Sequence, residues 1–236
     1  MKESLLIKPY NVIIRNIDEG YLLLQWPDQI DTNVNDAIIN VATNLREITN
    51  NHILDIIPAY CSLTVIYDYK MTTIINIIDL IKKINYKRGV KPLKIVKEIQ
   101  VCYDPEFSLD MDVLCKFHNL SRGEVIALHS IINYKISFIG FLPGFMYLSG
   151  LPTKLSTPRR ANPRQKVPVG AVAIGGNQTG IYPQSSPGGW HIIGRCPLVL
   201  FDIHKSSPCR FEAGENIKMK PVTKSEYWEI YNTETR

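Results

Sequence analysis

Apolar residues in the first third of the chain follow two patterns, one typical of strands and one typical of helices. They form short β-rich runs at Val12–Ile17 and Tyr21–Trp26, which predict two strands joined by a tight turn, and two further strands are expected around Pro58. Elsewhere they return every three or four positions, at Val34, Ala37, Ile38, Val41, Ala42, Leu45 and Ile48, and at Ile74, Ile77, Ile78, Ile81 and Ile84. Each series places one apolar stripe on a helix. We therefore expect two helices on a small, largely antiparallel sheet, an α+β sandwich of ferredoxin-like type.

The pattern changes after a linker-like stretch, Lys87–Pro92, which precedes a strand expected at about 94–103. That strand could belong to either side of a domain boundary in this region. We set the boundary after residue 92, which gives an N-terminal α+β domain over 1–92 and a second domain over 93–236.

The second domain begins with helices and continues with short strands. Helices are expected over Met111–Phe117 and from Arg122 to about Ile131, and Ser121 and Glu124 form a capping box at the start of the second one. The strands that follow are separated by Gly and Pro, at Tyr134–Ile139, Val169–Ile174, Thr179–Tyr182, Trp190–Ile193 and Leu198–Ile203. Short strands separated by Gly and Pro favour a closed or half-closed β-barrel. A short docked helix or a frayed end is expected after Lys224.

Composition narrows the class of protein without indicating a function. The 236 residues are 45% hydrophobic with a formal net charge of +5, too weak at this length to indicate nucleic acid or an anionic membrane as a partner. The five cysteines are far apart and form no C-x-x-C pair, so neither a disulfide framework nor a zinc site is expected. No signal-peptide pattern opens the chain and no apolar run approaches the roughly 20 residues of a spanning helix. We expect a soluble, cytoplasmic protein.

The densest positive charge lies between Pro152 and Pro168. Five cationic residues are interspersed with prolines there, and no carboxylate lies between them: Lys154, Arg159, Arg160, Arg164 and Lys166. Proline stiffens a loop, and a stiff loop loses less entropy when its arginine forks bind carboxylate or phosphate oxygens. We interpret this basic loop as an anion-binding segment, although a solvated or subunit-facing basic surface is the commoner explanation for an arbitrary loop.

Three glycine-bearing turns surround the basic loop, at Gly140–Phe145, Gly175–Gly180 and Ser186–Trp190. Glycine is typical of places where the backbone approaches a ligand or a strand closely, although a single such turn is more often structural. None is a Walker phosphate loop, because Ile181 and Tyr182 stand where Lys and Ser or Thr are required, and neither G-x-G-x-x-G nor G-x-S-x-G occurs. The clustering of these turns is what favours a site.

Among the five histidines, His129 is the candidate for proton transfer. It lies near the end of the capped helix, directly before the strand that leads into Gly140, so we expect its imidazole at a barrel mouth. Histidine suits general acid–base chemistry, but a lone histidine on a mainly apolar helix is as often a hydrogen-bonded structural residue. With no H-E-x-x-H, no H-x-H and no carboxylate–histidine cluster, a protein-held transition metal is not expected.

The blocks of the second half form a composite pattern. In chain order they are Leu128–Ser130, Ile139–Leu148, Pro158–Arg164, Val167–Gly170, Gln178–Pro183 and Ser186–Arg195, with weaker agreement at Ile57–Tyr60 and Val101–Asp104. In order and spacing they resemble the signature of the 5-oxoprolinase B-subunit / KipI family over most of the chain. The departures are mild, namely Ala171 where the family often has Ser, Cys196 where Thr is common, and Glu215 near a usual Gly-Asp.

The resemblance implies a fold and an assembly. Family members join a small N-terminal α+β domain to a cyclophilin-like β-barrel, and the B subunit pairs with a homologous, KipA-like C subunit. Together with an A subunit they carry out the ATP-dependent opening of 5-oxoproline to glutamate. ATP and Mg²⁺ are then bound by the assembled complex, not by a P-loop of this chain.

The basic loop and the matching blocks together supply the candidate site residues. The catalytic candidates are His129 and Arg164. The candidates for substrate or anion binding are Arg159, Arg160, Gln178, Tyr182 and Arg195. The candidates for lining a pocket are Phe141, Pro143, Gly144, Phe145, Tyr147, Pro187, Gly188, Gly189 and Trp190. The arginines would stabilise phosphate or carboxylate charge while ATP phosphorylates the lactam oxygen.

Two other functions stay open. Related sequences inhibit a sporulation histidine kinase, and the barrel would then present an apolar groove lined by Phe141, Phe145, Tyr147 and Trp190 to a kinase helix or a proline-bearing peptide. Others occur in urea carboxylase and allophanate-hydrolysing systems. This chain has neither a biotin domain nor an amidase Ser-Ser-Lys pattern, so it would be a separate component of such a system.

Overall fold

The computed structural model describes residues 2–28, 31–48, 52–84 and 95–235. The chain forms two compact units, one over Met1–Leu93 and the other over Lys94–Arg236. The linker expected at 87–92 and the domain boundary expected after residue 92 lie outside the described residues.

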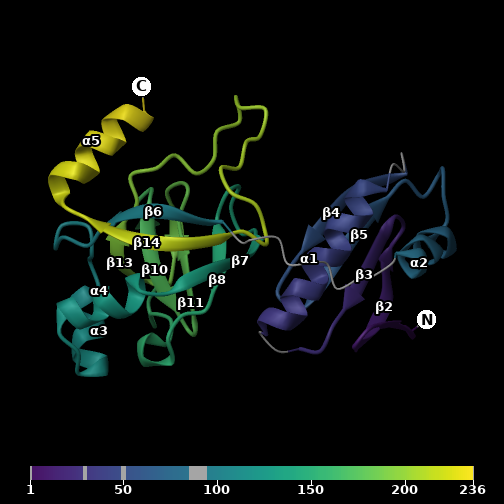
Figure 1. Cartoon of the computed structure of the whole chain (residues 1–236), viewed down its shortest axis with the longest axis horizontal. Coiled ribbons are helices and arrows are strands. Elements are labelled where there is room, and N and C mark those ends of the chain that lie inside the picture. The colour runs from purple at the N-terminus through teal and green to yellow at the C-terminus, as the bar shows by residue number, and fades with distance from the viewer. Residues whose placement is uncertain (1, 29–30, 49–51, 85–94, 236) are drawn as a thin grey trace. The chain divides into compact units, whose positions relative to one another are not determined.

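The N-terminal unit is a five-stranded sheet with two helices (Figure 1). In sheet order the strands are β1 (Lys2–Ile7), β2 (Tyr10–Asp18), β3 (Tyr21–Gln25), β5 (Ser62–Tyr67) and β4 (Ile53–Pro58), and every neighbouring pair is antiparallel. The helices are α1 (Thr32–Glu47) and α2 (Ile74–Lys83). Because β5 lies between β3 and β4, the segment β3–α1–β4 forms a split β-α-β unit. The ferredoxin-like type of the whole unit stays a prediction, and β1 was not predicted.

The core of this unit is made by the apolar residues of the predicted strands and helices. Val12 and Ile14 of β2 are buried, whereas Ile13 between them is exposed. The helices bury their apolar stripes, at Val34, Ile38, Val41, Ala42 and Leu45 in α1 and at Ile77, Ile78 and Ile81 in α2. Asp31 caps α1, because its side chain accepts a hydrogen bond from the N–H of Asn33 at 2.6 Å. Local pattern and packing agree in β2 and in both helices.

The second unit is built on a closed barrel of seven strands. Around the barrel they run β10 (Ala171–Gly175), β11 (Gln178–Ile181), β8 (Met146–Ser149), β7 (Asn133–Ile139), β14 (Asn216–Val222), β6 (Val96–Cys102) and β13 (His191–Arg195). The strand expected at about 94–103 is β6, which pairs in parallel with β14 along its whole length. The predicted barrel is confirmed, while its cyclophilin-like type stays a prediction.

One strand prediction in this unit is wrong. Residues 198–203 form no strand, and their ladder contact is an isolated bridge between Phe201 and Cys209. Leu198 and Leu200 are buried while Val199 and Phe201 are partly exposed, so burial alternates as in a strand although no neighbouring strand pairs with it. The barrel takes β14 instead, which was not predicted because lysines and a proline lower its apparent strand propensity.

Three α-helices accompany the barrel, α3 (Met111–His118), α4 (Arg122–Ser130) and α5 (Lys224–Glu234), with a short 3-10 turn at Thr153–Leu155. The predicted short docked helix at the C-terminal end is α5, which buries Tyr227 against Phe107 with ring centroids 4.5 Å apart. No helix of the described ranges is both long enough and apolar enough to span a bilayer.

The capping box predicted at the start of α4 is confirmed. The Ser121 hydroxyl accepts from the N–H of Glu124 at 3.3 Å, and the Glu124 carboxylate accepts from the N–H of Ser121 at 2.7 Å. We expect Ser121→Ala to destabilise the barrel unit by about 1 kcal/mol, because a helix N–H loses its acceptor. Urea denaturation followed by circular dichroism measures this loss. Thr223→Ala, in the matching box of α5, is the comparison, and an unchanged midpoint in both variants would contradict the capping role.

Candidate functional site

A buried carboxylate, Asp110, holds two arginines of the basic loop together. Arg164 donates two hydrogen bonds to it, from Nη1 to Oδ2 at 2.7 Å and from Nη2 to Oδ1 at 2.8 Å. Arg160 donates from Nη1 to Oδ1 at 2.7 Å. The backbone N–H of Ile192 in β13 donates to Oδ2 at 2.7 Å, and the Ile192 carbonyl accepts from the N–H of Asp110 at 2.8 Å. Asp110 is therefore fixed through both its side chain and its backbone.

The cluster presents positive charge at the surface. The Asp110 side chain is 2% exposed, whereas the Arg160 and Arg164 side chains are 28% and 21% exposed. One carboxylate balances one of the two guanidinium charges, which leaves one positive charge in excess. Each guanidinium has several N–H donors. Apart from a longer bond from Arg160 Nε to the Asn162 carbonyl at 3.4 Å, the remaining donors of this pair bond to nothing else within the described residues. These donors suit an oxyanion.

Sequence reasoning missed Asp110. The basic loop has no carboxylate among its cations, and Asp110 stands 50 residues before Arg160. In the sequence Asp110 directly precedes a predicted helix, a position where aspartate commonly caps. In the structure its side chain makes no capping bond and turns to the arginines instead. No local signal in the sequence distinguishes these two roles.

Backbone pairing holds the basic loop in place. A two-stranded sheet joins β9 (Arg164–Val167) to β12 (Ser186–Gly188). Four residues before β9, the N–H of Arg160 donates to the Gly189 carbonyl at 2.8 Å. The glycine-bearing turn after β11 therefore serves as the structural partner of the basic loop.

An aromatic cluster centred on Phe145 lies next to Arg159. The Phe145 ring centroid is 4.8 Å from that of Tyr147, 5.0 Å from Tyr182 and 5.7 Å from Trp190, all edge to face. The Arg159 guanidinium lies over the Trp190 ring, 5.9 Å from its centroid. Burial raises the pKa of Tyr182 to about 12, against the opposing charge of Arg159, so its hydroxyl stays protonated at neutral pH.

The residues expected to line a pocket form a packed cluster with an exposed margin. Gly144, Phe145 and Trp190 are buried, Tyr147, Gly188 and Gly189 are partly exposed, and Phe141, Pro143 and Pro187 are exposed. Gly144 packs closely on Phe201, because a Cβ at position 144 would lie 2.8 Å from the Cβ of Phe201. Gly188 makes room for Tyr182, whose hydroxyl would be 2.6 Å from a Cβ at that position. The accessible part of this surface therefore combines aromatic edges with Arg159.

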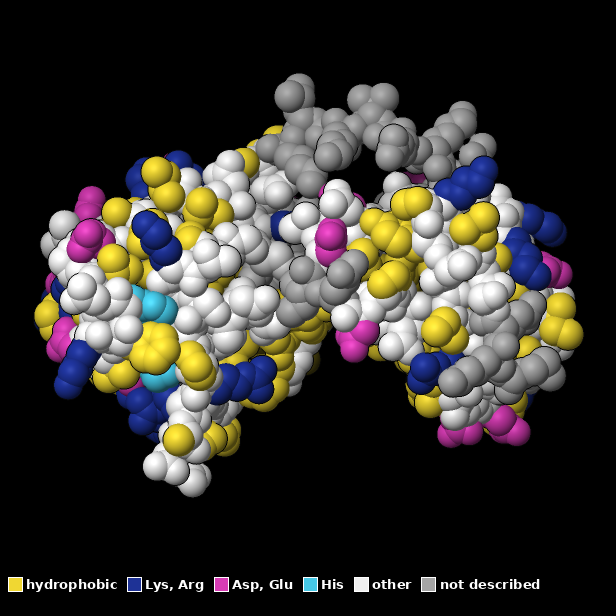
Figure 2. Space-filling view, turned by 90° about the horizontal axis from the view of Figure 1, so that it is seen from below, with side chains coloured by type: hydrophobic (Ala, Val, Ile, Leu, Met, Phe, Trp, Pro, Cys, Tyr) yellow, Lys and Arg dark blue, Asp and Glu magenta, His cyan; other side chains and the backbone are white. Residues whose placement is uncertain are grey.

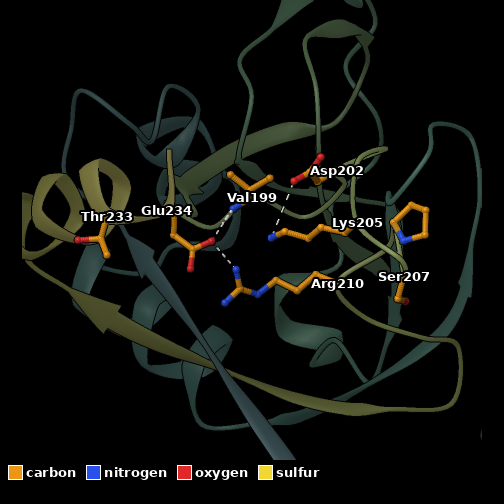
Figure 3. Close-up of a pocket in the computed structure, with 8 residues that line it drawn as sticks. Val199, Asp202, Lys205, Ser207, Arg210, Thr233 and Glu234 are labelled. Atoms are coloured by element: carbon orange, nitrogen blue, oxygen red, sulfur yellow. Dashed lines mark hydrogen bonds and ion pairs between the residues drawn. The ribbon is translucent and has the colours of Figure 1, made fainter. Parts of the chain in front are cut away.

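On the face of the barrel unit in Figure 2, hydrophobic side chains lie beside Lys and Arg side chains at the surface. The cavity in Figure 3, of about 360 Å³, is lined by other residues, namely Val199, Asp202, Lys205, Ser207, Pro208, Arg210, Thr233 and Glu234. Glu234 pairs with Arg210 and accepts from the N–H of Val199 at 3.4 Å, while Lys205 lies 4.0 Å from Asp202. The charges that line this cavity are thus paired with one another.

His129 lies in the interior of the barrel unit, so its expected position at a barrel mouth is wrong. Its side chain is 0% exposed. Burial raises the pKa of Tyr103 well above its usual value, so the Tyr103 hydroxyl stays protonated and donates to Nδ1 of His129 at 2.8 Å. The opposite nitrogen, Nε2, donates to Oγ1 of Thr179 at 3.0 Å, because the Thr179 hydroxyl itself donates to the Ala173 carbonyl.

These bonds leave His129 without a free nitrogen for proton transfer. Burial lowers its pKa to about 3, so the ring is neutral at neutral pH. A general acid or base needs a ring nitrogen within reach of the substrate. The His129 ring instead connects α4 to β11 and to Tyr103, which is a structural arrangement.

Gln178 and Arg195 do not belong to one compact site. Gln178 pairs with Gly175 at one end of β10, whereas Arg195 pairs with Ala171 at the other end. At about 3.3 Å per residue, the ends of this five-residue strand are roughly 13 Å apart. Arg195 donates from Nε to the Val169 carbonyl at 2.8 Å, and its guanidinium lies 5.7 Å from the centroid of the Phe107 ring. The structure therefore separates Gln178 from Arg195, whereas Asp110 joins Arg160 to Arg164.

The cysteines and the possible metal ligands do not form a further centre within the described ranges. No three His, Cys, Asp or Glu side chains there are grouped so that they could hold a metal ion. All five cysteines are free thiols. Burial raises the pKa of Cys196 to about 12, so this thiol stays protonated and unreactive.

Known proteins match most of the chain. A family model described as carboxyltransferase domain, subdomain C and D, matches residues 12–211. The B subunit of 5-oxoprolinase from Bacillus subtilis (strain 168) is 32% identical over 226 residues, which cover 91% of this chain and 94% of that protein. The protein of the same name from Haemophilus influenzae is 49% identical over 121 residues, which cover 51% of this chain and 57% of that protein.

Solved structures agree with this result. A conserved uncharacterized protein from Pyrococcus horikoshii, PH0987, is 37% identical with a TM-score of 0.57, and the match covers 92% of this chain and all of that one. The protein TTHA0988 is 30% identical with a TM-score of 0.79, over 89% of this chain but only 40% of that longer chain. Urea carboxylase from Kluyveromyces lactis shares the fold at 16% identity, with a TM-score of 0.74, over 98% of this chain and 24% of that one. The chain belongs to the 5-oxoprolinase B-subunit family.

Proposed function

We propose that this chain is the B subunit of a multi-subunit, ATP-dependent 5-oxoprolinase that opens 5-oxoproline to L-glutamate together with its A and C subunits. The observation that carries the proposal is the match to 94% of the length of a Bacillus subtilis protein with the B-subunit name. The arginine pair on Asp110 adds chemical support, because both substrates are anions. 5-Oxoproline carries a carboxylate and ATP carries phosphates.

The reaction explains why a cluster of fixed arginines is useful. The lactam of 5-oxoproline is stabilised by amide resonance, and phosphorylation of its oxygen by ATP gives an intermediate that water opens. Negative charge on the substrate carboxylate or on the phosphates of ATP is stabilised by arginine side chains that are already in position. Arg159, Arg160 and Arg164 supply such groups in this chain, and Mg²⁺ accompanies the phosphates of ATP.

The site is shared with another component of the assembly in this proposal. The histidine at position 129 is enclosed and hydrogen-bonded at both nitrogens, so the group that moves protons comes from the A or the C subunit. The accessible aromatic edges beside Arg159 give this chain an apolar and cationic wall. The assembled enzyme works in the cytoplasm.

Reconstitution tests this proposal. We expect ATP hydrolysis to rise with added 5-oxoproline only when this chain is combined with the A and C subunits, while the chain alone and each pairwise mixture stay at background. The measurement is the release of ADP and of glutamate with and without 5-oxoproline. Robust hydrolysis by this chain alone would refute the shared site, and a full assembly that ignores 5-oxoproline would refute the function.

The alternatives have less support. The Bacillus subtilis relative, 32% identical over 91% of this chain, carries the B-subunit name and not that of a kinase inhibitor. The likeness to urea carboxylase, at 16% identity, supports a common fold and not a common reaction. A histidine kinase added to the purified chain is a simple check, because the proposed role predicts no effect on its autophosphorylation.

A further inference from the structure

We propose that Asp110 is the positioning residue of an oxyanion-binding site formed by Arg160 and Arg164. The site takes a carboxylate or phosphate group, and the proposed function supplies one source of each, the carboxylate of 5-oxoproline and the phosphates of ATP. This inference rests on the proposed function for its substrates. Its geometric part concerns the isolated chain.

The first step of the argument is the geometry of the arginine pair. Two guanidinium groups repel each other and sit on long side chains that lose rotamer freedom when they are held. Three charge-assisted bonds to the Asp110 carboxylate, two from Arg164 and one from Arg160, offset this repulsion and hold both guanidinium groups on one carboxylate. The remaining N–H groups of both side chains then lie close together.

The second step is the rigidity of the anchor. Asp110 lies at the start of α3, and its carboxylate accepts from the Ile192 N–H while its own N–H bonds to the Ile192 carbonyl. The arginine pair is therefore anchored to the barrel strand β13 through Asp110. Sites whose supporting groups are locked in this way hold their geometry before the ligand binds.

The third step is the asymmetry of exposure. Asp110 is buried behind the arginines, at 2% exposure, whereas both arginines keep part of their surface open. A ligand approaching from solvent therefore meets N–H donors and a net positive charge, and not the carboxylate. Arg159 over the Trp190 ring continues the same cationic surface.

Asp110→Asn tests the proposal in the reconstituted enzyme, with Asp112→Asn as the matched control. Asp112 lies on the same helix and loses the same charge, but its side chain is 99% exposed. We expect Asp110→Asn to raise KM for one anionic substrate about tenfold while kcat changes less than about threefold, since a binding contact is lost and not the chemistry. The substrate whose KM rises, 5-oxoproline or ATP, identifies the source of the oxyanion. Asp112→Asn should leave both values unchanged.

Arg164→Lys provides an independent variant. It keeps the charge but cannot make the two-point bond to Asp110. We expect the same rise in KM, and in combination with Asp110→Asn we expect less than the sum of the two effects, because both changes remove one shared interaction. Full additivity would contradict the proposal. If Asp110→Asn does not fold, Arg164→Lys decides with the same readouts.

Hydrogen exchange of the isolated chain tests the geometry without any activity. We expect the amides of 158–166 to exchange faster in Asp110→Asn, and to exchange as in the wild type in Asp112→Asn. If the reconstituted wild type ignores 5-oxoproline, the proposed function fails while this measurement still decides the role of Asp110. Unchanged exchange in folded Asp110→Asn, or a fall in kcat with both KM values unchanged, would overturn the inference.

Discussion

Gly175→Ala is expected to destabilise the barrel unit by about 3 kcal/mol, because a new methyl group would overlap an aromatic ring that has no space to retreat. A Cβ at this position would lie 2.4 Å from Cδ1 and 2.6 Å from Cγ of Trp190. The Trp190 side chain is 5% exposed and packs edge to face on Phe145 and Tyr147. The ring must therefore move, and its contact with Arg159 moves with it.

Urea denaturation followed by tryptophan fluorescence measures this effect, since Trp190 reports on its own displacement. Gly123→Ala is the matched control. Nothing lies within 4 Å of a Cβ at that position, which is in the open part of α4, so we expect a gain of up to about 1 kcal/mol from helix propensity. Combining Gly175→Ala with Trp190→Leu should recover part of the lost stability. A Gly175→Ala protein with the midpoint and emission of the wild type would show that this packing is not as close as the structure has it.

Acidification is expected to destabilise the barrel unit through His129. Its pKa is lowered to about 3 by burial in the folded chain, against an ordinary value of 6.5. The unfolded chain therefore binds a proton as pH falls below about 6.5, while the folded chain does not until about pH 3. The stabilising contribution is complete above pH 6.5 and is lost as the pH falls toward 3. Between pH 7 and pH 5 the loss is about 2 kcal/mol.

His129→Gln removes the titrating group and tests this expectation. We expect the variant to be less stable at pH 7, because Tyr103 and Thr179 lose a well-placed partner. Its free energy of unfolding should nevertheless fall less steeply between pH 7 and pH 5 than that of the wild type. His204→Gln changes an exposed histidine and should keep the acid dependence of the wild type. An equal acid dependence in wild type and His129→Gln would show that another group is responsible.

Local patterns predicted most of the helices and strands for identifiable reasons. The apolar stripes of α1 and α2 follow the helical period, and the capping box of α4 spans only four residues. The apolar run at 198–203 was predicted as a strand, but strand formation requires a neighbour that local pattern does not supply. Among the strands that were missed, β14 contains lysines and a proline, which lower its apparent strand propensity.

The candidate site was predicted in part. Glycines, aromatic residues and arginines were grouped as one region because they lie close together in the chain, and the structure brings Arg160 to Gly189 and Arg159 to Trp190. Gln178 and Arg195 were grouped with the arginines as well, but they lie on different strands, β11 and β13, which pair with opposite ends of β10. His129 was expected at a barrel mouth because its position on the helix was known and its surroundings were not.

The sequence by itself determined the family, the two-part organisation of the pattern and the presence of a stiff, arginine-bearing loop, because these depend on residue types and short spacings. Only the tertiary structure decided what the arginines do before any ligand arrives. Asp110 and Ile192 come to Arg160 and Arg164 across long stretches of chain, brought there by the closure of the barrel and the docking of α3. Charge partners and burial depend on which distant segments the fold brings together. Here the fold brings Arg160 and Arg164 onto one buried carboxylate, although no carboxylate lies near them in the sequence.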